Sequence, residues 1–519
     1  MAAPSRVHAQ ACDSVWSRTT LAAMSGLRIR SVRVETHAPD PLPSIAGILD
    51  HLHVRTREST VQRILLVEPG DSVDTLRMAE SLRRLRQLRY LGDAALLAIR
   101  CNGGPVDLTV VTRDLWSAKP SVQLRSTSQA FAFTDRNVLG TGREVTLGFR
   151  SDLTGVGVTT GLTDPWFLGH DMSLGLATSG DGERGQWSVQ AQKHEHSMLD
   201  PWNLEAFAAG AALSPSAVGA TAVDGATIDA FRRTRAAVLG TRRVGVSSAG
   251  VVDLVGGAEY DRTAWETPRD GPAIVRRDFV GGDAGFLRRS VGYDTVTWLL
   301  SDHAIVDIPL STEGDVLVGV GRDRVPRALA THVDAWAGRM WMLGRRALLV
   351  ADVWGSGYRG GDAWSAATAR AALTVYGAAR GGVWSARVDA ERWFAPDPDV
   401  LSLTTQDPVS PAYLHRTPLP VRLLAGSVER DVHLWRLTRS WTLDAGAFAA
   451  GSSRGRDGAA VVGGGFRLAP ARLGRVTARL DVGVPVLRSG EVRSRPFVAI
   501  GITPWLDQDR ARDGRRERP

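Results

Sequence analysis

The sequence has 519 residues, of which 43% are hydrophobic, and its mean hydropathy is −0.10. The stretch that comes nearest to a transmembrane helix, Ala206–Val223, is rich in small residues and contains Pro215, which argues against a helical membrane span. A membrane location would therefore require a β-barrel, the other structure that satisfies every backbone group in lipid. The net charge of +8 is spread along the chain and not gathered in one basic stripe, which argues against nucleic-acid binding.

Residues 1–26 form a separate N-terminal segment. The tripeptide Ala9-Gln10-Ala11 has the small-x-small pattern of a signal-peptide cleavage site, so we expect the segment to be the remnant of a signal peptide, with an ordinary flexible terminus as the alternative. The two cysteines, Cys12 and Cys101, have no partners at metal-ligand spacing. In an exported protein they could form a disulfide that joins this segment to the first domain; two free thiols are the alternative.

The pattern of apolar and turn residues over 27–116 predicts a small α+β domain in the order strand, helix, helix, strand, strand. A strand is expected over Leu27–Thr36 and a short helix over Ser59–Val67, and a second helix follows with Asp71 as its N-cap. The turn Asn102–Pro105 then joins the two strands of a hairpin. The arginines of the second helix are expected on its solvent side: Arg83, Arg84, Arg86 and Arg89.

Residues 117–506 predict a transmembrane β-barrel. In Glu144–Arg150, apolar residues alternate with polar or small ones, and the same two-residue period recurs in Met172–Thr178 and Ala478–Val484. Lipid outside and water inside a barrel require this pattern, and the length of the region predicts an antiparallel barrel of about 16 strands. Scattered tryptophans favour belts at the membrane interfaces. Residues 507–519 are charged, and we expect them to form a disordered tail.

Several motifs resemble a known family. Residues 52–94 and 106–117 resemble a POTRA domain, of the kind that directly precedes the barrel in the outer-membrane protein assembly factor superfamily (BamA/TamA-like, with a bacterial surface antigen β-barrel). Three pieces carry this resemblance: the Pro69-Gly70-Asp71 turn, the Ala79-Glu80-Ser81 helix register with Leu85, and the closing strand Val110–Asp114. Two further stretches resemble parts of the family's barrel: Asn137–Phe149 its first hairpin, and Thr163–Leu176 its D-P-x-x-x-G turn.

The resemblance implies a location in the bacterial outer membrane, with the POTRA domain in the periplasm. It implies assembly, insertion or translocation of proteins, without cofactors, by strand templating at the barrel seam and at the POTRA sheet edge. The expected partners are the lipid bilayer, unfolded outer-membrane or secreted client proteins, and periplasmic accessory proteins. The seam would lie between a first strand, Ser121–Phe133, and a last strand, Arg495–Trp505. The seam residues selected by position are Val122, Leu124, Phe497, Val498 and Ile500.

Three departures from the family pattern keep other functions open. The family's Arg-Gly-aromatic loop tip is absent, and Arg416 is its nearest substitute. The chain does not end on an aromatic strand terminus, and only one POTRA domain is evident. The alternatives are a two-partner-type secretion pore, a passive or structural barrel without insertase activity, and a soluble protein built from β-sandwiches.

No catalytic set is recognisable, and we expect the protein not to be an enzyme. His194-Glu195-His196 places two imidazoles on one face of a strand, but no third metal ligand is identifiable from the sequence. The glycine-rich stretches are not followed by the Lys-Ser/Thr of a P-loop, and no G-x-S-x-G elbow occurs. Neither a cofactor nor a metal is therefore predicted.

Overall fold

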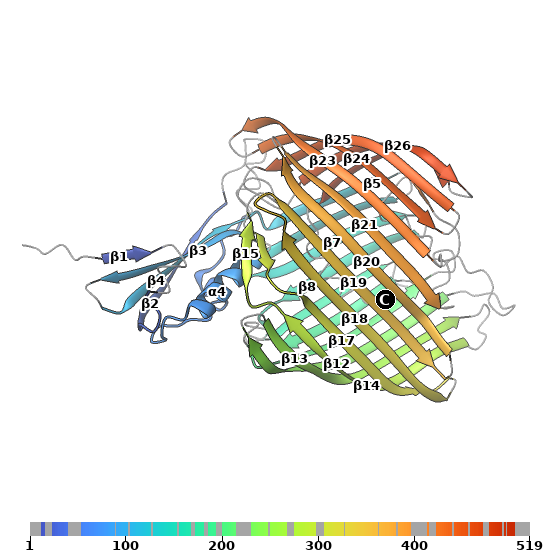
Figure 1. Cartoon of the computed structure of the whole chain (residues 1–519), viewed down its shortest axis with the longest axis horizontal. Helices are drawn as coiled ribbons and strands as arrows, with labels where there is room; N and C mark the ends of the chain where they lie inside the picture. The colour runs from blue at the N-terminus through green and yellow to red at the C-terminus, as the bar shows by residue number, and fades with distance from the viewer. Residues whose placement is uncertain are drawn as a thin grey trace, which may run out of the picture. The chain divides into compact units, whose positions relative to one another are not determined.

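The structure is a computed structural model, shown in Figure 1. It describes residues 12–15, 23–39, 53–88, 90–101, 104–125, 128–152, 155–167, 172–180, 185–193, 200–213, 230–247, 250–266, 274–296, 306–325, 327–361, 363–379, 382–395, 413–414, 422–438, 441–454, 457–470, 477–489, 493–494 and 496–503. The chain divides into two compact units. The N-terminal unit comprises Met1–Ala118, Asp135–Arg143 and His196–Met198, and the rest forms the barrel unit.

The N-terminal unit contains a mixed four-stranded sheet and two helices. In chain order its elements are β1 (Cys12–Val15), β2 (Ile29–His37), α3 (Glu58–Gln62), α4 (Thr75–Gln87), β3 (Leu91–Cys101) and β4 (Val106–Asp114). The sheet order is β1-β3-β4-β2, and only the β2–β4 pair is parallel. Alternate residues of β4 are fully buried, as a half-covered strand requires. The predicted order of strands and helices over residues 27–116 is confirmed, and β1 is an addition to it.

The helices differ from their predicted limits. The first is a single turn and does not reach Val67. The N-cap of α4 is Asp74 and not Asp71, because the Asp74 carboxylate accepts hydrogen bonds from the backbone N–H groups of Leu76 and Arg77, at 2.8 and 3.2 Å. The Asp71 carboxylate instead accepts the N–H of Glu68 within the preceding turn. Arg84 was predicted on the solvent side but is buried, and its guanidinium donates to the carbonyl of Ile64.

The tip of one hairpin belongs to the N-terminal unit. The Asn137 amide donates to the Thr56 hydroxyl at 2.7 Å, and its carbonyl oxygen accepts the N–H of Gly142. Gly140 has a φ of +73°, and a Cβ at this position would lie 2.3 Å from the backbone oxygen of Arg55. Close backbone contact therefore requires glycine here, within the stretch that resembles the family's first barrel hairpin.

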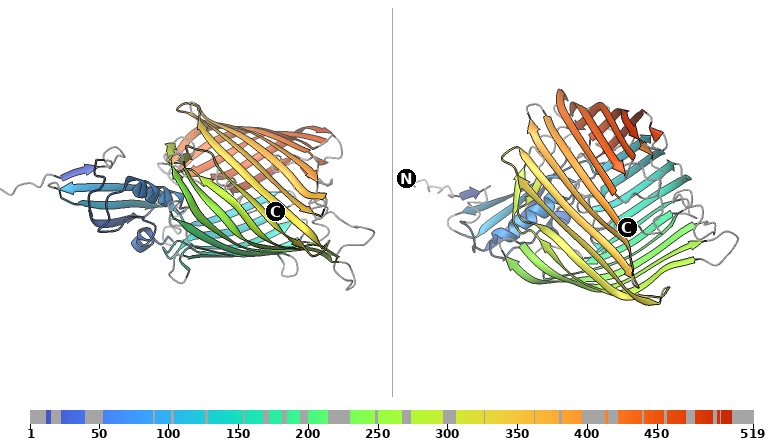
Figure 2. Two further views of the ribbon diagram at one scale, coloured as in Figure 1. Left: turned by 60° about the horizontal axis from the view of Figure 1, so that its bottom comes forward. Right: turned by 45° about the vertical axis from the view of Figure 1, so that its right-hand side comes forward.

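The barrel unit is a closed ring of antiparallel strands (Figures 1 and 2). Its strands are β5 (Ala118–Arg125), β6 (Ser128–Val138), β7 (Arg143–Asp152), β8 (Gly155–Asp164), β9 (Met172–Gly180), β10 (Gly185–Lys193), β11 (Trp202–Leu213), β12 (Ala230–Ser247), β13 (Gly250–Glu266), β14 (Ile274–Arg289), β17 (Glu313–Asp323), β18 (Ala328–Met342), β19 (Ala347–Gly360), β20 (Ala363–Ala379), β21 (Gly382–Ala395), β23 (Arg422–Thr438), β24 (Trp441–Arg454), β25 (Asp457–Pro470), β26 (Thr477–Ser489) and β28 (Phe497–Thr503). Consecutive strands in this series are neighbours, and β28 pairs with β5 to complete the ring.

The described residues thus form twenty barrel strands, and the prediction of about 16 was wrong. The prediction allowed about 24 residues for each strand with its connection, whereas the first hairpins are shorter. The predicted first strand Ser121–Phe133 is in fact two strands, β5 and β6, with two residues between them. Two residues also separate β7 from β8. Short connections of this kind give more strands in the same length of chain.

The two-residue period was predicted correctly. In β7, Leu147 and Phe149 are exposed, and the Thr146 hydroxyl on the opposite face lies 2.9 Å from that of Thr134. Met172 and Leu176 of β9 are likewise exposed. The described residues contain no helix with the length and apolar character needed to cross a bilayer.

Two small two-stranded sheets complete the described part of the barrel unit: the hairpin of β15 (Tyr293–Val296) with β16 (Val306–Pro309), and a pair of strands far apart in the chain, β22 (Tyr413–Leu414) with β27 (Arg493–Ser494). In the first of these, Val296 and Ile308 pack with Leu348 of β19. Residues of β18, β19 and β20 surround them: Met340, Met342, Val350 and Tyr376. The connection between β14 and β17 therefore folds back onto these three strands.

Candidate functional site

The seam between the last and first strands of the barrel is narrowly paired. In the described residues, β28 and β5 share one residue pair, Ile500 opposite Leu124. On its other side, β28 is in register with β26 over seven pairs, from Thr477 opposite Thr503 to Gly483 opposite Phe497. Backbone N–H and C=O groups that do not pair across a seam are a template for another extended segment.

Four of the five predicted seam residues are described only by their backbone: Val122 and Leu124 in β5, and Phe497 and Ile500 in β28. Val498 lies opposite Val482 of β26, and its side chain is exposed. The structure therefore brings Leu124 and Ile500 together across the seam. Arg416 lies outside the described residues, as does His194-Glu195-His196.

One face of the sheet is concave, which identifies it as the inside of the barrel. Three strand spacings separate β14 from β19, about 14 Å on a flat sheet. The guanidinium of Arg277 in β14 nevertheless lies 4.1 Å from the ring centroid of Tyr358 in β19. In a closed barrel the side chains of the concave face converge, so a contact across two intervening strands is expected on that face. The face that carries Arg277 and Tyr358 therefore lines the interior.

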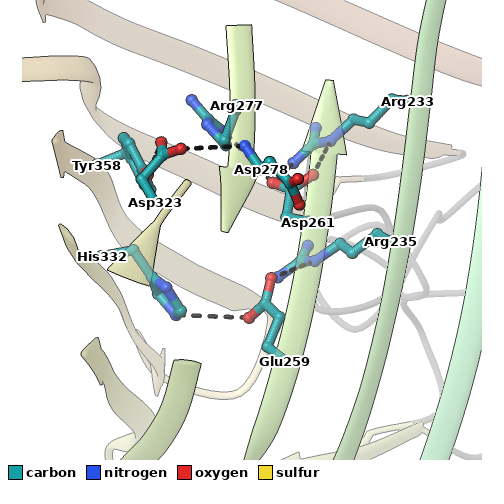
Figure 3. Close-up of polar contacts among 9 residues, drawn as sticks. All are labelled: Arg233, Arg235, Glu259, Asp261, Arg277, Asp278, Asp323, His332 and Tyr358. Carbon is teal, nitrogen blue, oxygen red and sulfur yellow. Dashed lines mark hydrogen bonds and ion pairs between the residues drawn. The ribbon is translucent and has the colours of Figure 1, made fainter. Parts of the chain in front are cut away.

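This interior face carries a network of ion pairs, the interior cluster (Figure 3). Its members are Arg233, Arg235, Glu259, Asp261, Arg277, Asp323, His332 and Tyr358. The Asp261 carboxylate receives two hydrogen bonds from Arg233, at 3.1 and 2.9 Å, and one from Arg277 at 3.3 Å. The Tyr358 hydroxyl donates to Asp323 at 2.6 Å. Buried carboxylates are thus matched with guanidinium and hydroxyl donors, as a low-dielectric wall requires.

A second interior group surrounds Arg467 of β25. Its side chain is almost fully buried, and its guanidinium contacts Glu429 at 2.7 Å, Asp481 at 2.6 Å and Asp431 at 3.5 Å. A Cβ at Gly446 would lie 2.6 Å from this guanidinium, so glycine at that position makes room for it. The interior wall is therefore built from large charged side chains placed over glycines on neighbouring strands.

The outer face of the barrel is apolar. Large apolar side chains are exposed on strand after strand, among them Leu204, Val238, Leu254, Val280, Val320, Val353, Leu373, Val388, Leu424, Val428, Val462, Phe466, Leu480 and Val482. Exposed tryptophans accompany them: Trp187, Trp202, Trp341, Trp364 and Trp435. An apolar surface that extends over so many strands is far larger than a typical soluble monomer exposes.

The N-terminal unit presents a second strand edge. The short strand β1 pairs antiparallel with β3 and covers that side of the sheet. At the opposite end of the sheet order, β2 pairs with β4 and has no further strand beside it among the described residues. The outer edge of β2 is therefore the one that a partner strand could extend.

An ion pair links β2 to β4. Both Arg30 and the Ser31 hydroxyl donate to the Asp107 carboxylate, at 2.9 and 2.6 Å. The hydrogen bond from Arg30 lowers the pKa of Asp107 to about 2 and raises the pKa of Arg30 itself. Elsewhere in the unit, burial raises the pKa of Tyr90, so its phenol stays neutral.

The charged residues of the interior were not predicted as a site from the sequence. Within the described chain, Glu259, Asp283 and His332 form a group whose ligand atoms are close enough to share a metal ion. These residues lie on three different strands, and no local motif joins them. The available signal was their position: each falls on the inward register of its strand, where a charged residue in a barrel needs a partner.

Comparisons with known proteins give similarity in structure only. No family model matches the chain, and no curated protein matches it. The chain is similar to CdiB from Acinetobacter baumannii (9% identity, 95% of this chain and 78% of that chain, TM-score 0.40) and to CdiB from Escherichia coli (10%, 95% and 80%, TM-score 0.41). It is also similar to BamA from Haemophilus ducreyi lacking POTRA domains 1–3 (11%, 91% and 84%, TM-score 0.32). At these identities and TM-scores the similarities carry no inference about what the chain does.

Proposed function

We propose that the chain is an outer-membrane β-barrel that helps other proteins to insert into, or cross, that membrane by templating their strands at its seam. The observation that carries the proposal is the single residue pair, Ile500 opposite Leu124, between the described parts of β28 and β5. A weakly paired seam opens at lower cost than any other part of the wall, and its freed edges accept an extended client segment. The reaction needs no cofactor, because backbone hydrogen bonds supply its free energy.

The membrane location is part of the same proposal. The apolar outer face and the polar interior are the arrangement that lipid outside and water inside demand. In this scheme the N-terminal unit is a POTRA domain in the periplasm. The edge of β2 then receives client segments or accessory proteins before they reach the seam.

A disulfide that holds the seam closed tests the proposal. In a background with both native cysteines replaced by serine, Leu124→Cys and Ile500→Cys would allow a disulfide across the seam. We expect the oxidised protein in liposomes to stop promoting insertion of a urea-unfolded barrel client, and reduction to restore that activity. The matched control places the same bond between well-paired strands, with Ala449→Cys and Val462→Cys in β24 and β25, and should leave insertion unchanged. Full insertion through a locked seam would refute templating.

One observation favours a second candidate, a secretion pore. The interior wall is lined with charged groups such as Asp261 and Arg467, a surface along which a hydrated chain can pass. Passage through the lumen does not require the seam to open. A locked-seam barrel that still exports a dedicated partner would therefore favour the pore over the insertase.

A further inference from the structure

Three ligand-type side chains from three strands meet inside the barrel. Nε2 of His332 in β18 lies 3.1 Å from Oδ1 of Asp283 in β14 and 3.6 Å from Oε2 of Glu259 in β13. One ligand atom from each of the three residues lies within 4.8 Å of those of the other two. Figure 3 shows Glu259 and His332 directed toward each other across the intervening strands.

Asp283 provides an independent reason to expect a cation. Its side chain is completely buried, and apart from the ion-pair contact with His332 neither carboxylate oxygen has a hydrogen-bond partner of good geometry among the described residues. The contact with His332 is close enough for a hydrogen bond but lacks the required direction, because Nε2 of His332 also has no hydrogen-bond partner in the described chain. A buried carboxylate that faces an imidazole nitrogen in this way needs either a cation between the two groups or a proton on the imidazole to offset the cost of the buried charge.

The separations of the imidazole nitrogen from the two carboxylates fit a tetrahedral metal ion. Zinc binds imidazole nitrogen and carboxylate oxygen at about 2.0–2.2 Å, which places neighbouring tetrahedral ligands about 3.3–3.5 Å apart. The observed separations of 3.1 and 3.6 Å bracket that range. An all-oxygen site for calcium or magnesium would need more ligands than these three residues offer.

The surroundings hold the ligands in place. Nε of Arg235 donates to Oε1 of Glu259 at 2.7 Å, which leaves Oε2 directed toward His332. The Phe279 ring packs edge-on against the imidazole, with centroids 5.6 Å apart. A Cβ at Gly319 would lie 2.1 Å from the imidazole and 2.6 Å from Asp283, so only glycine leaves room for the pair. Supporting contacts of this kind commonly fix the orientation of metal ligands.

We propose that Glu259, Asp283 and His332 bind a divalent transition-metal ion, of which Zn²⁺ fits best. The ion neutralises two buried carboxylates and ties β13, β14 and β18 together across the interior. The competing arrangement is a protonated His332 that forms ion pairs with both carboxylates and needs no metal. The two arrangements differ in a direct measurement of bound metal.

Metal content is measured on the full-length protein, refolded in detergent with and without ZnCl₂ and then dialysed against metal-free buffer. We expect one zinc per chain after loading. We also expect a higher temperature for the conversion of the folded to the unfolded gel band, and EDTA should reverse that rise. The variants His332→Gln and Asp283→Asn should each lower zinc affinity at least tenfold. The control His433→Gln removes the histidine of an exposed His–Asp pair outside this group and should retain the zinc.

The wild-type protein alone can overturn the proposal, so a variant that fails to fold does not leave it untested. Absence of stoichiometric zinc in the loaded and dialysed wild type would refute it. Zinc that persists in folded His332→Gln and Asp283→Asn would place the metal elsewhere and refute it as well. Neither result depends on insertase activity, so this proposal and the proposed function fail separately.

Discussion

At the scale of single residues, the interior of the barrel is stabilised by a few guanidinium groups that each serve several carboxylates. Arg467 is the most deeply buried of them and contacts Glu429, Asp431 and Asp481. The loss of one partner from such a group leaves buried charge without compensation, which costs far more than the loss of a surface pair.

Arg467→Met should therefore lower the free energy of unfolding by about 3–5 kcal/mol. The methionine keeps part of the apolar stem but leaves the carboxylates without their guanidinium. The urea midpoint of unfolding from detergent micelles measures the effect. Arg324→Met is the control, since Arg324 is exposed and 4.0 Å from Asp278, and it should change stability by less than about 1 kcal/mol. Equal losses in the two variants would show that Arg467 is not compensating buried charge.

The depressed pKa of Asp107 gives the N-terminal unit a pH dependence. A carboxyl with a lowered pKa in the folded state stabilises that state above its ordinary pKa of about 4, and this contribution is lost as the pH falls toward about 2. Asp107→Asn should therefore increase hydrogen exchange in β2 and β4 at pH 5. The difference from wild type, compared at the same pH, should shrink as the pH approaches 2. A difference that stays constant over this range would contradict the assignment.

At the scale of elements, the short strand β1 determines how far apart the two cysteines lie. The β1–β3 register places Cys12 directly opposite Cys101. Residues opposite each other in an antiparallel pair have Cβ atoms about 4.5–5.5 Å apart, close to the separation that a disulfide needs. The sequence left the bonded and free alternatives open, because nothing in the spacing of the cysteines predicted that β1 would join the sheet.

We predict that Cys12 and Cys101 form a disulfide when the folded protein is treated with oxidised glutathione. The intact mass should fall by the two thiol hydrogens, about 2 Da, and neither thiol should then react with maleimide. Reduction should increase hydrogen exchange along β3 as β1 separates from it. The Cys12→Ser variant should retain one reactive thiol and show the same faster exchange. Two reactive thiols after oxidation would show that β1 does not hold this register.

The features that could be predicted are those whose sequence pattern lies within a few neighbouring residues. The alternation in Glu144–Arg150 follows from the two sides of one strand, so it was read correctly from seven residues. Connection lengths are a weaker local signal, which is why the strand number was wrong. The cap of α4 was misplaced by three residues, since Asp71 and Asp74 are both good caps and only the turn geometry decides between them.

Contacts inside the barrel had no local signal at all. Glu259, Asp283 and His332 meet because the wall curves and because Gly319 stands between two of them. The sequence determines each residue's face but not which strands approach across the lumen. The seam is an intermediate case: its last strand could be located by position in the chain, but the predicted first strand merged β5 with β6, and the single-pair register could not be predicted.

At the scale of the whole barrel, the hairpin β15–β16 lies on the interior wall. Met340 and Met342, which pack against it, alternate with the exposed Trp341 and share the face of His332 on β18. The chain between β14 and β17 therefore takes up part of the interior. We therefore expect the docked hairpin to restrict what can enter the lumen.

Ile308 is the most deeply buried residue of the hairpin and packs in one cluster with Val296 and Leu348. Ile308→Ser should weaken docking by about 3 kcal/mol, which shifts the docked-to-undocked ratio by more than a hundredfold. We expect a larger and more variable single-channel conductance in planar bilayers. Leu310→Ser, an exposed position beside the same hairpin, should leave the conductance unchanged. If a folded Ile308→Ser barrel conducts like wild type, the hairpin does not limit the lumen, and a client path through the interior would have to be closed by some other part of the chain.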